Sequence, residues 1–194
     1  KEFFTMMEPF IYRRSLDFEA IEEIKSMKQG INKSLKGNKS ENIKLGFGGI
    51  REIEFFIQTN QLLFGGRNKA IRVRGSLSAL RILKREDIIS EEDYLCLSEA
   101  YIFLRNLENR VQITFGLQTH KLPEKLEDRA VLARKMRIEG KTKEELAVNL
   151  MKAYEFHTSF VGKMFSEQFA EKEKRDMAEV ISNEWEKSQK GEVL

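Results

Sequence analysis

Apolar residues recur at intervals of three and four along most of the chain, which is the spacing of one face of an α-helix. Polar or glycine-rich segments separate these stretches, and no segment of useful length alternates as a β-strand does. The pattern predicts helices over Asp17 to about Lys36, Ile50 to Phe64, Ser76 to about Lys84, Ser90 to Phe115, Glu127 to Arg137 and Thr142 to beyond Phe169. A short first segment, Lys1 to Phe10, is expected to end at Pro9. We therefore predict an all-α fold, a bundle of about six to seven helices with long antiparallel members.

Residues at the ends of these segments support the predicted boundaries. Gly65 and Gly66 follow the second long stretch, and glycine commonly ends a helix. Ser76 and Ser90 can each cap a helix through the hydroxyl oxygen. Thr142 begins a capping-box pattern with the glutamate three residues later.

The composition is that of a charged, proline-poor helical protein. Hydrophobic residues make up 41% of the chain, which is enough to form a core, and charged residues make up 34%. Only 2 prolines interrupt the helical pattern. Charge is concentrated in the last part of the chain. We therefore expect a helical domain over residues 1–169 and a charged helical extension or linker over residues 170–194.

The charge balance and the apolar runs exclude several classes of partner. The net charge is only +3, so nucleic acid is not an expected partner. No apolar run approaches the ~18 residues of a membrane span, and no signal peptide is visible, so we expect a cytoplasmic protein without a membrane partner. Cys96 lies in an apolar run and is expected to be a buried, inert thiol. Because the chain begins at Lys1 and not at Met, we expect it to be a piece of a longer protein.

A glycine-rich turn precedes the most apolar of the predicted helices. Gly46, Gly48 and Gly49 would let the backbone approach a ligand closely. The start of a helix offers unpaired N–H groups and a partial positive charge, and Lys44 and Arg51 add full charges on either side of the turn. These features suit a phosphate group. A tight structural turn would use the same glycines, and both interpretations stay open.

The helix that follows the turn carries one narrow polar stripe. On a helical projection, Arg51, Glu54, Gln58 and Gln61 lie within about 80° of one another, and most of the remaining surface is apolar. A helix of this kind is expected to be buried, and buried polar groups need partners. The stripe therefore either joins an internal hydrogen-bond network or lines a site.

Glu108 interrupts an apolar stripe of the long helix predicted from Ser90, at a position where a charge is costly. Arg105 lies three residues before it and Gln112 four residues after it, both within helical reach. Arg51 could pair with it from another helix. A buried ion pair that fixes the register of the helices explains Glu108 as well as a functional site does.

The chain contains no recognisable catalytic or metal-binding motif. His120 and His157 have no cysteine, histidine or carboxylate at metal-ligand spacing. A Ser–His–Asp set, a P-loop and an HExxH pattern are also missing. We expect His120 to form hydrogen bonds in a loop and His157 to pack between helices.

One long motif is similar to that of a known family. KLGFGGIREIEF, residues 44–55, resembles the KLGxGGIREIEF signature of glutamine synthetase adenylyltransferase, also called the adenylyl-removing enzyme. PFIYRR at 9–14, GGR at 65–67 and QTH at 118–120 follow in the order expected for that family. The resemblance extends over roughly residues 3–169 and is specific, because several motifs occur in the correct order.

The resemblance implies the parent enzyme's activity and partners. It indicates the helical partner of a nucleotidyltransferase domain, in the half of the parent that removes AMP from glutamine synthetase by phosphorolysis and releases ADP. The other half would carry out ATP-dependent adenylylation. The family holds Mg²⁺ with an aspartate pair, DxD, which this chain lacks, so we expect no catalytic residue and no metal ligand here and an inactive isolated fragment. ATP, ADP or phosphate would bind in the parent. Implied partners are glutamine synthetase, the PII signalling protein and the adjacent nucleotidyltransferase domain.

The resemblance also implies roles for individual residues. Phosphate or nucleotide binding would fall to Lys44, Gly46, Gly48, Gly49 and Arg51. A supporting set would be Glu52, Glu54, Gln58, Arg105 and Glu108, in which the two acids near the turn would orient the cations or help to hold the metal.

Two alternatives use the same sequence. One is a regulatory or docking module for PII or glutamine synthetase, with a purely structural glycine loop. The other is the related helical domain of a PII uridylyltransferase. A basic helical RNA-binding domain centred on Arg67 to Arg74 is a weaker alternative, which the near-balanced charge opposes.

Overall fold

A computed structural model describes residues 2–13, 26–27, 30, 41–116 and 119–164 of the chain. Within these ranges it contains α-helices, one 3₁₀-helix and an isolated β-bridge, which confirms the predicted all-α class. The elements are α1 (Glu2–Ile11), α3 (Ile50–Gly65), η1 (Lys69–Ile71), α4 (Ser76–Arg85), α5 (Glu91–Phe115), α6 (Leu126–Lys135) and a helix over residues 143–164.

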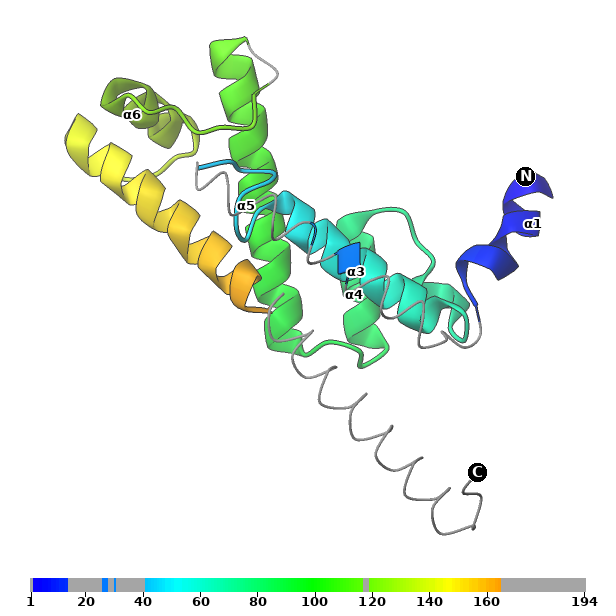
Figure 1. Cartoon of the computed structure of the whole chain (residues 1–194). Coiled ribbons are helices and arrows are strands. Elements are labelled where there is room, and N and C mark those ends of the chain that lie inside the picture. The colour runs from blue at the N-terminus through cyan, green and yellow to red at the C-terminus, as the bar shows by residue number, and fades with distance from the viewer. Residues whose placement is uncertain (1, 14–25, 28–29, 31–40, 117–118, 165–194) are drawn as a thin grey trace, which may run out of the picture.

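The long helix α5 runs through the middle of the described structure (Figure 1). Helices α3 and α4 pack against it, and α6 packs near its C-terminal end. The helix over residues 143–164 runs back along α5 in the opposite direction, as predicted for long antiparallel helices. This arrangement brings the start of α3 close to both α5 and the helix over residues 143–164.

The core is a continuous cluster of aliphatic side chains contributed by these helices. Burying one large aliphatic side chain is worth about 1.5–3 kcal/mol, so the cluster is the main source of stability. Its fully buried members include Ile50, Ile53, Leu80, Leu104, Leu107, Leu132 and Leu150.

The predicted helix boundaries that fall within the described residues are correct within about two residues, but two of the predicted end signals are wrong. Ser90 caps α5 in a complete capping box with Asp93, as expected. By contrast, Ser76 is the first residue of α4, and Gly75 occupies the cap position without a side-chain hydrogen bond. Pro9 does not end α1, because it removes only its own N–H bond, and the Tyr12 amide still reaches the Glu8 carbonyl at 2.8 Å.

The polar stripe predicted for α3 does not match the burial that the structure shows. Arg51 and Gln58 are exposed, whereas the buried polar residues of α3 are Glu52, Thr59 and Asn60. Gln61 does join an internal network, because its amide donates to the carbonyl oxygens of Ile71 and Val73 at 2.8 Å each. The stripe therefore divides into a solvent-facing part and an internal part.

His157 lies between the helix over residues 143–164 and α5, as the prediction of a packing residue requires. Its ring lies 4.5 Å from that of Phe103, centroid to centroid, and meets Phe156 edge-on at 5.3 Å. Burial lowers the pKa of His157 below its ordinary value of 6.5, and the charge of Glu99 opposes this shift in part.

We therefore expect the free energy of unfolding to fall as the pH drops below 6.5, the ordinary pKa of the imidazole. The unfolded chain takes up a proton at His157 first, and the loss ends once the pH is below the lower folded-state pKa. Urea denaturation at several pH values between 7.5 and 5.0 should show a smaller loss for His157→Gln than for the wild type. The same pH dependence in both proteins would contradict this assignment.

Some predictions fall outside the described residues. These include most of the helix predicted from Asp17 and all of the charged extension over residues 170–194, so the proposed domain division remains a prediction. Among the helices that the structure describes, none is long and apolar enough to cross a membrane.

Candidate functional site

The glycine-rich turn before α3 is a compact structure held by hydrogen bonds among neighbouring residues of the chain. The side-chain oxygen of Asn42 accepts the amides of Lys44 and Leu45 at 3.0 and 2.8 Å, and its carbonyl accepts the amide of Gly46 at 2.7 Å. The Gly49 amide then donates to the Gly46 carbonyl at 3.0 Å. The chain therefore folds back on itself before the helix begins.

Packing against the helix over residues 143–164 requires a glycine at Gly48. This residue has a φ of +67°, and an added Cβ would lie only 1.7 Å from the carbonyl oxygen of Thr158. One turn along the same helix, Gly162 has no side chain, and the ring of Phe47 lies where its Cβ would be. The turn and the helix thus approach each other closely at two points. This close packing explains the glycines at both points without a ligand.

The predicted unpaired N–H groups at the start of α3 are not available. The amide of Ile50 donates to the Ile43 carbonyl at 3.1 Å, and the amide of Arg51 donates to the Lys44 carbonyl at 3.0 Å. The amide of Glu52 donates to the Gly49 carbonyl at 3.0 Å. The sequence-based expectation of a backbone anion site is wrong for these three groups, because the turn supplies their acceptors itself.

Glu52 is part of the turn and is not exposed to a ligand. It is 2% exposed, and its Oε2 accepts the buried amide of Gly48 at 3.0 Å. A glutamate three residues after the helix cap is well placed to reach back in this way. Glu54 is only half-buried on the same helix. Of the two acids predicted to orient cations, Glu52 thus holds the backbone of the turn.

Lys44 and Arg51 remain as positive charges at the edge of the turn. Their backbones are joined by the bond from the Arg51 amide to the Lys44 carbonyl, so the two residues are fixed beside each other. Lys44 is half-buried and Arg51 is exposed. Among the residues that the structure describes, neither has a carboxylate partner, which leaves both charges for an anion.

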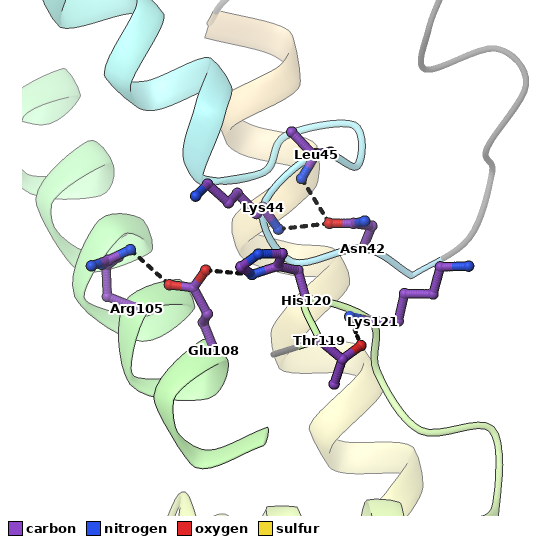
Figure 2. Close-up of polar contacts among 8 residues, drawn as sticks. All are labelled: Asn42, Lys44, Leu45, Arg105, Glu108, Thr119, His120 and Lys121. Atoms are coloured by element: carbon purple, nitrogen blue, oxygen red, sulfur yellow. Dashed lines mark hydrogen bonds and ion pairs between the residues drawn. The ribbon is translucent and has the colours of Figure 1, made fainter. Parts of the chain in front are cut away.

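A second cluster centres on the buried carboxylate of Glu108 in α5 (Figure 2). The side chain is 4% exposed and lies 2.7 Å from Arg105 Nη1, as predicted. Its other oxygen lies 2.7 Å from Nδ1 of His120, an ion-pair distance with poor alignment for a hydrogen bond. Arg105 and His120, and not Arg51, are therefore the neighbours of the Glu108 carboxylate.

The structure links the two clusters through a backbone contact that the sequence did not indicate. The Ile43 amide donates to the His120 carbonyl at 2.7 Å, and the Leu122 amide donates to the Glu41 carbonyl at 2.8 Å. In Figure 2 the His120 ring lies between Glu108 and the turn that carries Lys44. Predicted residues on α5 and in the turn are thus brought into one region.

Two residues with clear roles here, Asn42 and His120, were missing from the predicted site, and one predicted residue, Gln58, has no visible role. Asn42 initiates the turn, and its position two residues before Lys44 is a recognisable signal for an Asx turn. The contact between His120 and Glu108 depends on the path of the chain between α5 and α6, and no sequence pattern near either residue indicated it. Gln58 was included, but it is exposed and forms no hydrogen bond with the other predicted site residues described.

Other reactive groups do not add to the site. Cys96 is half-buried and not fully buried as predicted, and burial, followed by the charge of Glu92, raises the pKa of its thiol, which disfavours the reactive thiolate. Within the described ranges, no group of three His, Cys, Asp or Glu side chains could hold a metal ion.

Comparison with known proteins identifies similar sequences. The family model for GlnD PII-uridylyltransferase matches residues 20–169. The bifunctional glutamine synthetase adenylyltransferase/adenylyl-removing enzyme of Xanthobacter autotrophicus is 43% identical over 64% of this chain and 13% of its own length. The enzyme of the same name from Burkholderia mallei is 37% identical over 87% of this chain and 18% of its own length. The chain thus spans less than a fifth of either relative's length.

Proposed function

The chain belongs to the GlnD PII-uridylyltransferase family. Because the relatives reported above are glutamine synthetase adenylyltransferases, we propose that it is a helical part of an enzyme that adenylylates and deadenylylates glutamine synthetase. In this proposal it completes the phosphate side of a nucleotidyltransferase site. The adjacent nucleotidyltransferase domain, glutamine synthetase and PII are the proposed partners. The proposed location is the cytoplasm, where glutamine synthetase would be modified.

The observation that carries this proposal is the pair of cations at the edge of the turn. Lys44 and Arg51 are held together by a backbone hydrogen bond, and neither has a carboxylate partner among the described residues. Two uncompensated cations on a fixed scaffold favour an anion that carries more than one negative charge. A phosphate or the phosphate of an adenylyl group meets that requirement.

The proposed chemistry assigns this chain a binding and positioning role. Lys44 and Arg51 contact phosphate oxygens through their side chains, since the amides at the start of α3 are already used within the turn. Stabilising the charge on the transferred group is a large part of catalysis in phosphoryl transfer. The fixed backbone of the turn lowers the cost of bringing the two cations together when substrate binds.

Mg²⁺ and ATP, ADP or phosphate belong to this proposal through the parent enzyme. The part of the chain that the structure describes contains no group of three His, Cys, Asp or Glu side chains that could hold a metal ion, and no step of the mechanism is assigned to a metal held here. When bound elsewhere in the parent, the metal would neutralise phosphate charge.

A docking module is the second candidate, and the tip of the turn favours it. Leu45 and Phe47 are 48% and 60% exposed, and two apolar side chains next to cations suit a protein surface as well as a nucleotide. The close packing of Gly48 against Thr158 explains why a glycine is needed there, without a ligand. In this case the turn would support contact with PII or glutamine synthetase without touching the reacting groups.

Lys44→Ala and Arg51→Ala in the full-length enzyme separate these candidates. We expect a ten- to hundredfold loss of deadenylylation turnover, because each variant removes one charge-assisted contact to phosphate. Binding to glutamine synthetase should stay unchanged in a pull-down or by calorimetry.

Gln58→Ala is the matched control, because Gln58 is also exposed on α3 but carries no charge. It should retain full turnover. Loss of binding to glutamine synthetase in the Lys44 and Arg51 variants, with turnover of the bound complex intact, would instead establish the docking module.

A further inference from the structure

The segment just before the glycine-rich turn is joined to two distant parts of the chain, by a short backbone contact and by an ion pair between Glu41 and Arg129 of α6. Residues 41–43 pair with residues 120–122 through the bonds between Ile43 and His120 and between Leu122 and Glu41. Lys44 follows directly. The contact with His120 is therefore one of the bonds that fix the Lys44 backbone, beside the bond from the Arg51 amide to the Lys44 carbonyl.

His120 is in turn held through its side chain. Its Nδ1 atom is buried and has the carboxylate of Glu108 as its polar neighbour, at 2.7 Å. Glu108 belongs to the middle of the structure, on the long helix α5, and its side chain is 4% exposed. A buried carboxylate strongly favours conformations that keep its cationic or N–H partners close.

We propose that His120 is a positioning residue for the glycine-rich turn, and that it transmits the fixed position of Glu108 through its own carbonyl to Ile43 and Lys44. This inference rests on the proposed function only for its effect on catalysis. The ring keeps the turn at a fixed position relative to α5 and does not contact the substrate. Arg105 contacts the other oxygen of Glu108 from the solvent side.

Hydrogen exchange of the 194-residue chain, measured residue by residue by NMR, tests whether His120 positions the turn, without any activity assay. In His120→Ala we expect the amides of Ile43, Leu45 and Gly46 to exchange at least tenfold faster than in the wild type. Amides in the middle of α5, such as that of Leu104, should keep their rates. A general loss of stability would accelerate all of these amides together.

Two conservative variants make the test specific to one ring atom. His120→Asn places an N–H group near the position of Nδ1 and should restore slow exchange in the turn. His120→Gln places it near the position of Nε2 and should not. Lys135→Ala is a matched control, because it removes another side-chain link to α5, the 2.8 Å bond to Thr114.

Exchange in the turn that is unchanged in His120→Ala, or equally fast in the Asn and Gln variants, would overturn the proposal. In the full-length enzyme, His120→Ala should add little to the turnover loss of Lys44→Ala, because both disturb the same cation. Additive losses would also overturn it. If Lys44→Ala leaves turnover intact, the proposed function fails, while the exchange experiment still decides the role of His120.

Discussion

Replacing Gly48 with alanine is expected to lower the free energy of unfolding by about 3–5 kcal/mol. Two effects combine. The φ of +67° is strained for any residue with a Cβ, and that Cβ would lie 1.7 Å from the backbone oxygen of Thr158. Backbone in the middle of a helix cannot move aside as a flexible side chain can. Urea denaturation of the wild type and the variant measures the difference.

Gly116→Ala is the matched control for this experiment. Gly116 has a similar φ of +63°, but no atom lies within 4 Å of the added Cβ. It should therefore show only the cost of the backbone conformation, about 1–2 kcal/mol. Equal losses in the two variants would mean that the close approach of the turn to the helix over residues 143–164 contributes nothing.

Glu52→Ala is expected to lower the free energy of unfolding by about 3 kcal/mol. The substitution leaves the buried amide of Gly48 without its acceptor, which costs about 1–3 kcal/mol. It also removes an acid from the first turn of α3, worth about 0.3–1 kcal/mol, and leaves a cavity. Glu52→Gln keeps a carbonyl oxygen for the amide and should cost about 1 kcal/mol.

Glu54→Ala serves as the control for charge on the same helix. Glu54 is half-buried two residues further along, and its loss should change the free energy of unfolding by about 0.5 kcal/mol or less. Thermal denaturation of Glu52→Ala, Glu52→Gln and Glu54→Ala ranks the three variants by their loss of stability. If Glu52→Ala were no worse than Glu54→Ala, Glu52 would not be holding the turn.

The helices and the family could be predicted from the sequence because their signals are local or cumulative. The spacing of apolar residues gave α3 and α5 nearly to the residue, and Ser90 identified the start of α5 through bonds within four residues. The resemblance in the turn motif is confirmed by the family match over residues 20–169. Glu108 could also be identified, since a charge inside an apolar stripe must have a partner.

The rest depended on contacts between distant parts of the chain. Nothing near Gly48 in the sequence indicates Thr158, and nothing near Glu108 indicates His120. The availability of the amides at the start of α3 was also misjudged, because the carbonyls that occupy them come from the folded turn itself. The assignment of Lys44 and Arg51 to phosphate stays a prediction.

The close approach of Gly48 to Thr158 also has a consequence for biosynthesis. The turn leaves the ribosome long before His120 and Thr158 do, yet it depends on both for its neighbours. Domains fold during synthesis only as their parts become available. Residues 42–49 can therefore pack against Thr158 only after the helix over residues 143–164 has emerged, so a nascent chain truncated before that helix should form the local hydrogen bonds of the turn without this packing.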